Sequence, residues 1–143
     1  MLIIKLVQIF LTIFLTGLIW TIQLVHYPSF NDVGKNEFIQ FHKNHTTRIS
    51  ILVIPFMICE LLISIAWLVL ELNQFSIVNA SLVLLIWLAT FLISVPIHNA
   101  LVQNFNLVLI QKLNQTNWIR TILWSLKSFL LLGYFFISIK QLQ

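Results

Sequence analysis

Four histidines are the residues of this chain best suited to chemistry, because an imidazole can transfer a proton near neutral pH or bind a metal ion. They all fall at the same ends of long apolar segments, close to two arginines. The set comprises His26, His42, His45 and His98, with Arg48 and Arg120. Only 8% of the residues are charged, so this gathering of ionisable groups predicts a functional site.

Three interpretations of the histidines stay open from the sequence. His42 and His45 are three residues apart and share a face on a helix, so they could bind one metal ion together. His26 or His98 would then complete its coordination sphere. Alternatively, His26 and His98 could be opposed axial ligands of a haem held between helices. The imidazoles could also serve only as amphipathic groups at the membrane interface.

The two arginines can present forked donors to an anion. Arg48 follows His45 by three residues and Arg120 opens the last apolar segment, so each could orient a carboxylate, a phenolate or a haem propionate. Interfacial anchoring is the alternative role for both. The predicted catalytic set is His26, His45, His98, Arg48 and Arg120.

One further pair of charges falls deep inside the apolar segments. Glu60 lies about fourteen residues into the second segment and Lys127 about nine into the fourth, and both segments start from the same side. A lone charge at this depth costs roughly 2.5–3.5 kcal/mol, which a partner largely offsets. We therefore expect Glu60 and Lys127 to pair, as a structural clamp or as part of a proton or substrate path.

The elements that must position these residues are membrane spans. A hydrophobic fraction of 59% and a mean hydropathy of +0.97 identify an integral membrane protein. At ~1.5 Å per residue, a span of about 20 residues crosses roughly 30 Å of hydrocarbon. The sequence predicts one all-α domain over residues 1–143, an antiparallel four-helix bundle with spans at about 2–26, 46–71, 77–98 and 118–139. No basic tract interleaved with aromatic residues suggests nucleic acid as a partner.

The connections predict the remaining features. Residues 29–44 and 99–116 carry helical apolar stripes, so we expect short interfacial helices there, or a continuation of the third span in the second case. Asn31 or Asp32 is the expected N-cap of the first, and Pro55 is expected to kink the second span. These two connections and the residues next to them carry five of the eight lysines and arginines, which predicts that they lie on the cytoplasmic side of a bacterial membrane. The five are Lys35, Lys43, Arg48, Lys112 and Arg120.

Several short motifs resemble a known family. The succession His26-Tyr27-Pro28, the segment Phe38 to Arg48, the turn Val95 to Leu101 and the opening Asn117 to Thr121 resemble the anthrone-oxygenase-like family of small four-span membrane proteins. The resemblance implies a four-helix bundle with a polar site near one face, to which Val95-Pro96 and Arg120 contribute. For the fungal members it implies oxygenation of a polycyclic phenolic anthrone. A weaker similarity to membrane protoporphyrinogen oxidases and copper-resistance-type bundles implies haem or copper.

The leading functional hypothesis is a membrane oxidoreductase or oxygenase-like protein that acts on a small lipophilic substrate. Its cofactor would be a metal ion or haem, if it has one. Two hypotheses come from other classes of protein. The chain could be a haem- or copper-binding module without its own chemistry, or a small transporter or accessory subunit in which Glu60 and Lys127 relay protons.

Overall fold

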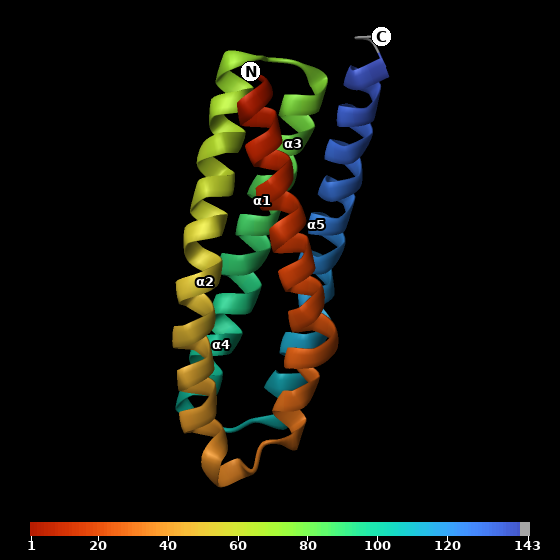
Figure 1. Ribbon diagram of the computed structural model, residues 1–143. Helices are drawn as coiled ribbons and strands as arrows, with labels where there is room; N and C mark the ends of the chain where they lie inside the picture. The colour runs from red at the N-terminus through yellow and green to blue at the C-terminus, as the bar shows by residue number, and fades with distance from the viewer. Residues whose placement is uncertain (141–143) are drawn as a thin grey trace.

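The computed structural model describes residues 1–140, which form four long helical rods packed side by side (Figure 1). The first rod is α1 (Leu2–Thr21) with η1 (Ile22–His26), and the second is α2 (Lys35–Leu70). The third is α3 (Gln74–Ala89) with η3 (Thr90–Ser94) and α4 (Val95–Gln103), and the fourth is α5 (Leu107–Lys140). The described residues contain no strand, and neighbouring rods run antiparallel. The predicted all-α four-helix bundle is confirmed.

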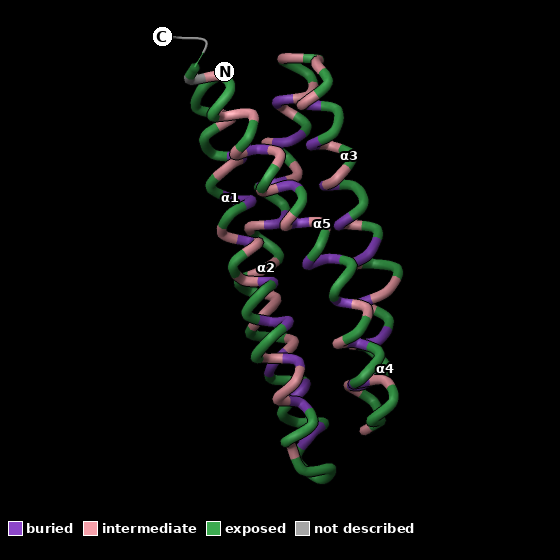
Figure 2. The backbone as a smooth tube through the Cα atoms, turned by 90° about the vertical axis from the view of Figure 1, so that its right-hand side faces the viewer, coloured by how far each residue is buried: buried purple, intermediate pink, exposed green. Residues whose placement is uncertain are grey.

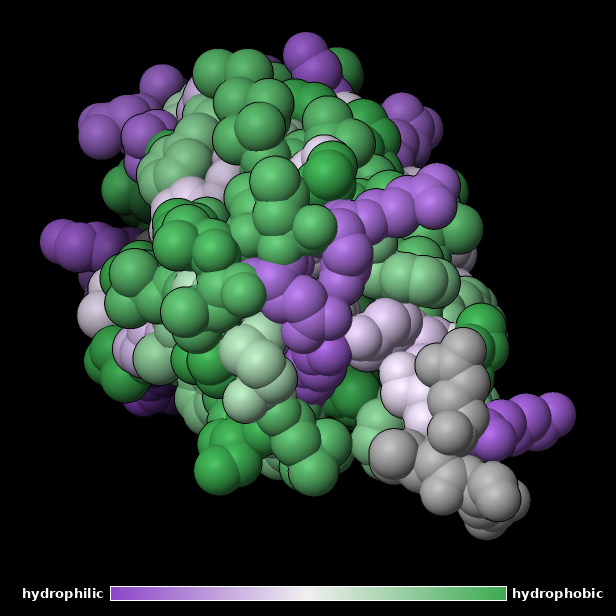
Figure 3. Space-filling model, turned by 90° about the horizontal axis from the view of Figure 1, so that it is seen from above, coloured by the Kyte–Doolittle hydropathy of each residue, from purple (hydrophilic) through white to green (hydrophobic). Residues whose placement is uncertain are grey.

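The outer surface of the bundle is apolar, as a lipid environment requires. All four rods are long and apolar enough to cross a membrane. Buried positions follow the inner faces of the rods while exposed ones follow the outside (Figure 2), where large side chains such as Phe10, Ile51 and Phe129 are 62–74% exposed. Seen end-on, hydrophobic side chains cover most of the outline (Figure 3). The chain is therefore a multi-pass membrane protein.

The prediction of separate interfacial helices is wrong. The first connection is a short 3-10 helix, η2 (Pro28–Asp32), after which α2 runs unbroken for 36 residues. Asn31 and Asp32 lie in η2, and Gly34 is the N-cap instead. An uninterrupted helix satisfies its backbone groups internally, which a break near the membrane would not. At ~1.5 Å per residue α2 is about 54 Å long, so its first turns extend beyond the hydrocarbon.

The third connection is shorter still. The third rod continues as α4, and only residues 104–106 separate it from α5. The side chain of Asn106 accepts hydrogen bonds from the backbone N–H groups of Val108 and Leu109, and this caps the start of α5. The apolar stripe of residues 99–116 therefore belongs to the ends of two rods. Of the two predictions for this segment, a separate interfacial helix or a continuation of the third span, the second agrees with residues 99–103.

Two wide turns of π-helix precede prolines. η1 ends just before Tyr27-Pro28, and η3 ends just before Val95-Pro96. A proline has no N–H group, and its ring clashes with the carbonyl group four residues earlier. An i→i+5 turn places one extra residue in the helix, and such turns are frequent at functional sites. Pro55, in contrast, lies within continuous α-helix.

The end of the bundle that carries both termini is closed by polar contacts. The backbone N–H of Ser76 donates to the Asn73 side chain at 2.9 Å and the Asn73 N–H donates to the Ser76 hydroxyl, so the pair forms a capping box at the start of α3. In the same hairpin, Glu71 pairs with Lys5 of α1 at 2.7 Å, and Lys5 also donates to Tyr134 of α5. These contacts join α1, the α2–α3 hairpin and α5.

A second polar layer lies deeper in the bundle and contains the predicted charge pair. Lys127 Nζ lies 2.6 Å from Glu60 Oε1, and both side chains are fully buried. Thr12 donates to the same carboxylate oxygen at 3.0 Å, while Trp124 Nε1 donates to Oε2 at 3.3 Å. Glu60 and Lys127 therefore form the contact expected from their positions along the second and fourth spans. Residues of three rods meet at this one carboxylate.

Not every polar residue of α1 faces inward. Trp20 is 38% exposed and donates to Ser125 on the outside of the bundle, where its ring also meets Trp118 edge-on. The inner face of α1 instead carries Thr12 and, further along, Ile19. Eight residues turn a helix by about 80° beyond two full turns, so Trp20 cannot share the face of Thr12.

We predict that Lys127→Met lowers the free energy of unfolding by about 3–5 kcal/mol, because it leaves the buried Glu60 carboxylate without its cation. The double variant Glu60→Gln/Lys127→Met should recover most of this loss. Unfolding in mixed micelles measures both. The control is Lys43→Met, which removes an exposed charge from α2 and should change stability by less than about 0.5 kcal/mol. Equal costs for Lys127→Met and the control would contradict a structural role for the pair.

Candidate functional site

The four predicted histidines meet at the end of the bundle opposite the termini. His26 of η1 lies 2.6 Å from His45 of α2, measured from Nε2 to Nδ1. His42 of α2 lies 3.2 Å from His98 of α4, measured from Nε2 to Nδ1. The ring centres of His45 are 6.0 Å from those of both His42 and His98. Three separate rods therefore contribute to one cluster of two hydrogen-bonded imidazole pairs.

The cluster extends from His98 into the bundle through a phenol. The hydroxyl group of Tyr27 lies 2.9 Å from His98 Nε2 and the Tyr27 side chain is buried. Arg120 of α5 borders the same cavity as these two side chains, is 6% exposed, and donates from Nη1 to Ser94 at 3.3 Å. Its guanidinium group also lies 5.5 Å from the ring centre of Trp124. A cation, a phenol and an imidazole are thus gathered at one place.

Two buried phenylalanines hold the imidazole rings in position. Phe38 stacks on His42 with ring centres 5.3 Å apart and an interplanar angle of 12°. Phe30 meets His42 and His45 edge-on at 5.3 and 5.1 Å. The stack on Phe38 holds the His42 ring most firmly, and the edge-on contacts restrict the orientations of His45, so the hydrogen bonds between the rings have a preferred geometry.

Local helix geometry explains why these rings meet. His42 and His45 are three residues apart on a regular helix, so both project from one face of α2. His26 is the last residue of the π-helical η1, and His98 follows the π-helical η3 by four residues. Each π turn shifts the face on which later residues project. These shifts are how the first and third rods direct His26 and His98 toward α2.

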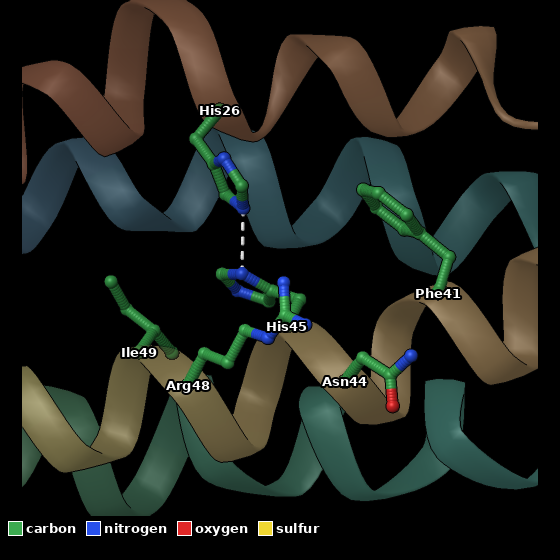
Figure 4. Close-up of a pocket in the computed structure, with 6 residues that line it drawn as sticks. All are labelled: His26, Phe41, Asn44, His45, Arg48 and Ile49. Atoms are coloured by element: carbon green, nitrogen blue, oxygen red, sulfur yellow. Dashed lines mark hydrogen bonds between the residues drawn. The ribbon is translucent and has the colours of Figure 1, made fainter.

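A groove between the first rod and α2 reaches one side of the cluster (Figure 4). Its volume is about 350 Å³, and both His26 and His45 line it. Asn44 and Arg48 border the groove from the polar, exposed start of α2. Figure 4 shows His45 directed across the groove at His26, with Arg48 and Asn44 on the same stretch of helix. This side of the cluster therefore opens at the polar, exposed start of α2.

A second cavity, of about 300 Å³, reaches the other side of the cluster between α2 and the third rod. Tyr27, His98 and Arg120 form its polar end. Apolar side chains such as Val53 and Met57 form its walls. Small-molecule sites commonly have this composition, with mostly apolar walls and a few convergent polar groups.

The second cavity opens sideways, toward lipid. Ile54 and Ile58 of α2 and Phe91 of η3 line it and are 42–54% exposed on the outside of the bundle. These residues lie farther into the apolar part of the rods than the histidines do. A lipophilic molecule could therefore enter from the bilayer without crossing water.

Three buried polar atoms at this site have no hydrogen-bond partner among the described residues. Arg120 Nε and Trp87 Nε1 are buried without a hydrogen-bond partner, and both side chains line the second cavity. His42 Nδ1 is a third such atom, inside the imidazole cluster. An unpaired buried donor costs about 1–3 kcal/mol. Donors left available in this way are suited to binding a ligand.

The predicted site residues therefore fall into two groups. All four histidines come together, and Arg120 lies with His98 at the second cavity. Arg48 borders the groove instead, so the two arginines do not line the same space. Glu60 and Lys127 form the separate deeper layer described above.

Metal and haem binding stay predictions. Among the described residues, no group of three or more His, Cys, Asp or Glu side chains has the geometry to hold a metal ion. The proposed axial ligands, His26 and His98, are each bonded to another side chain, His45 for the first and Tyr27 for the second. Both ring nitrogens of His98 are engaged, by Tyr27 and by His42, so one of these contacts would have to open before that ring could bind iron.

Sequence reasoning did not single out Tyr27 as a functional residue. It follows His26 directly and contributes to the sequence-based predictions only as part of the motif His26-Tyr27-Pro28. In an α-helix, adjacent residues point about 100° apart, so a shared site is not expected from their spacing. The signal available was the Tyr-Pro dipeptide itself, because a proline forces local rearrangement of the preceding turn.

Comparisons with models of protein families, with curated proteins and with solved structures find no match to this chain. The class of protein is therefore defined by fold and site geometry. It is a multi-pass membrane four-helix bundle with an imidazole cluster between a groove and a lipid-facing cavity.

We predict that a double-mutant cycle of Tyr27→Phe and His98→Ala gives a coupling energy of about 1 kcal/mol, because each change removes the same buried hydrogen bond. Unfolding of the four proteins in mixed micelles measures it. The control cycle pairs His98→Ala with Tyr134→Phe at the opposite end of the bundle, where coupling should stay below about 0.5 kcal/mol. Equal coupling in both cycles would show that the Tyr27–His98 contact contributes nothing.

Proposed function

We propose that this protein is a membrane-embedded oxygenase-like oxidoreductase that acts on a small lipophilic substrate with an acidic C–H or O–H group. The observation that carries the proposal is the lipid-facing cavity whose inner end bears Tyr27, His98 and Arg120. The resemblance of the sequence to the anthrone-oxygenase-like family suggests the same substrate chemistry.

The shape and composition of the cavity support a lipophilic substrate. A volume of about 300 Å³ lies at the lower end of the range for small-molecule sites. Its apolar walls favour a hydrocarbon or aromatic body, and its opening between Ile54 and Phe91 faces lipid. The buried Arg120 guanidinium supplies a fixed positive charge at the polar end, where it would orient an oxygen anion.

The polar end also supports removal of a proton. If His98 Nε2 accepts a hydrogen bond from Tyr27, the phenol can pass its proton to the imidazole as it takes one from the substrate. Arg120 would then stabilise the enolate or phenolate oxygen that forms. Proton removal from a carbon that is conjugated with a carbonyl group makes that carbon electron-rich enough to react with molecular oxygen.

The overall reaction balances with oxygen as the only oxidant. A methylene group conjugated with an aromatic ketone, such as that of anthrone, loses one proton to the base, and the resulting carbanion adds to O₂ and is reprotonated to a hydroperoxide. Loss of the second C–H proton and cleavage of the O–O bond then give a ketone and water. The carbon loses four electrons and O₂ gains four. The side chains needed are a base and an anion-stabilising cation.

We place the histidine end of the bundle on the cytoplasmic side of a bacterial membrane. The charges that favour this orientation lie near that end, at the start of α2 and along the first part of α5, and include Lys35, Lys43 and Lys112. Fluorescent labelling of a cysteine introduced at position 36, with a reagent that does not cross membranes, tests the orientation. Labelling of intact cells would contradict it.

The proposal predicts oxygen consumption with anthrone as the probe substrate. The protein in lipid nanodiscs should convert anthrone and O₂ to anthraquinone and water faster than empty nanodiscs do. Arg120→Gln should lower this rate by about 100-fold, because it removes a preorganised donor to the enolate. Val53→Trp should lower it by filling the cavity. An oxygen electrode and the absorbance of the quinone measure the rate.

Lys112→Gln is the matched control, because it removes an exposed cation from the same helix as Arg120. Its rate should equal that of the wild type. Metal analysis and the absorbance of the haem Soret band belong to the same experiment. Stoichiometric metal or haem that is lost on His98→Ala, together with no oxygen consumption, would favour the cofactor-binding module instead.

A further inference from the structure

We infer that the imidazole cluster is a proton relay that connects the lipid-facing cavity to water at the groove between the first rod and α2. This inference rests on the proposed function, since it gives the route by which the substrate proton reaches and leaves the bulk. The observation behind it is that the groove and the cavity share only Ile49 among their lining residues. His26 and His45 line the groove, whereas His98 lines the cavity.

The first half of the relay starts at the cavity. If Tyr27 donates to His98 Nε2, the neutral His98 ring carries its hydrogen on Nδ1 and donates it to His42 Nε2 at 3.2 Å. A proton that arrives at His98 Nε2 then releases the Nδ1 hydrogen to His42. No atom needs to travel more than the length of one hydrogen bond in each step.

The buried, unpartnered Nδ1 of His42 gives the relay its next step. With Nε2 accepting, this nitrogen carries the ring hydrogen of His42, yet it has no hydrogen-bond partner. The ring centre of His45 lies 6.0 Å away, and its Nε2 is not engaged by the contact with His26. His42 is held by its stack on Phe38, but His45 meets Phe30 only edge-on. The terminal torsion of a histidine has a broad energy profile, so rotation of the His45 ring can bring the two nitrogens together.

The second half of the relay ends at the groove. A proton that reaches His45 Nε2 releases the Nδ1 hydrogen to His26 Nε2 across 2.6 Å. His26 is half-exposed and lines the groove with the exposed Asn44 and Arg48. The hydrogen on the far nitrogen of His26 then leaves to water. One proton enters at Tyr27 and one leaves at His26, so charge balances along the chain.

Hydrogen exchange of anthrone tests the relay without oxygen. Under anaerobic conditions in D₂O, the protein in nanodiscs should introduce deuterium at the anthrone methylene group faster than empty nanodiscs do. His26→Gln should slow this exchange by about tenfold or more, because it removes the last ionisable group. The dissociation constant for anthrone should change less than twofold, since His26 does not line the second cavity. Mass spectrometry measures the exchange.

Two further measurements separate a relay from a structural role. Free imidazole that enters the groove should restore exchange in His26→Gln, and His45→Gln should repeat the loss. Phe41→Leu, which changes the same groove without removing an ionisable group, is the matched control and should exchange at the wild-type rate.

The possible failures are distinguishable. Exchange by the wild type no faster than in empty nanodiscs would overturn the proposed function and the relay together. Wild-type exchange that both histidine variants retain would overturn the relay alone. Slow exchange in the variants without rescue by imidazole would assign His26 and His45 a structural role, and would also overturn the relay.

Discussion

The fold depends on one constraint, which is that polar groups inside a lipid-embedded bundle must find partners within the protein. The carboxylate of Glu60 meets this constraint most fully, because Lys127, Thr12 and Trp124 all donate to it from two other rods. Because these contacts come from different rods, the rods can slide along one another very little without breaking them. A rod that slid by one turn would leave the buried charge unpaired.

The layer of contacts around Glu60 fixes the alignment of the rods, and the imidazole cluster depends on that alignment. With the rods held in register, the end of the bundle beyond Glu60 can carry π-helical turns, unpaired donors and an open cavity. Each of these features weakens local structure, and the π turns, the cavity and three of the unpaired polar atoms lie around His98 and Tyr27. The molecule thus separates a fully satisfied polar layer from one whose hydrogen-bonding capacity is left partly unused.

The histidines border two different environments, one polar and one apolar. His26 and His45 face a groove at the exposed polar start of α2, whereas His98 faces a cavity with an apolar mouth. A substrate dissolved in lipid and a proton dissolved in water can therefore reach the same cluster by different routes. An imidazole chain suits that position, because each ring has one nitrogen for each neighbour.

The sequence by itself determined the membrane class, the four apolar rods and the end at which the histidines gather, because hydropathy and segment length report directly on the lipid solvent. It also indicated the Glu60–Lys127 contact, since depth along a helix is proportional to residue number. Only the tertiary structure decided that α2 is continuous, that Arg48 and Arg120 border different spaces, and that Tyr27 joins His98. These features depend on the rotation of each rod about its axis. The π turns before Pro28 and Pro96 change that rotation by an amount that residue spacing does not reveal.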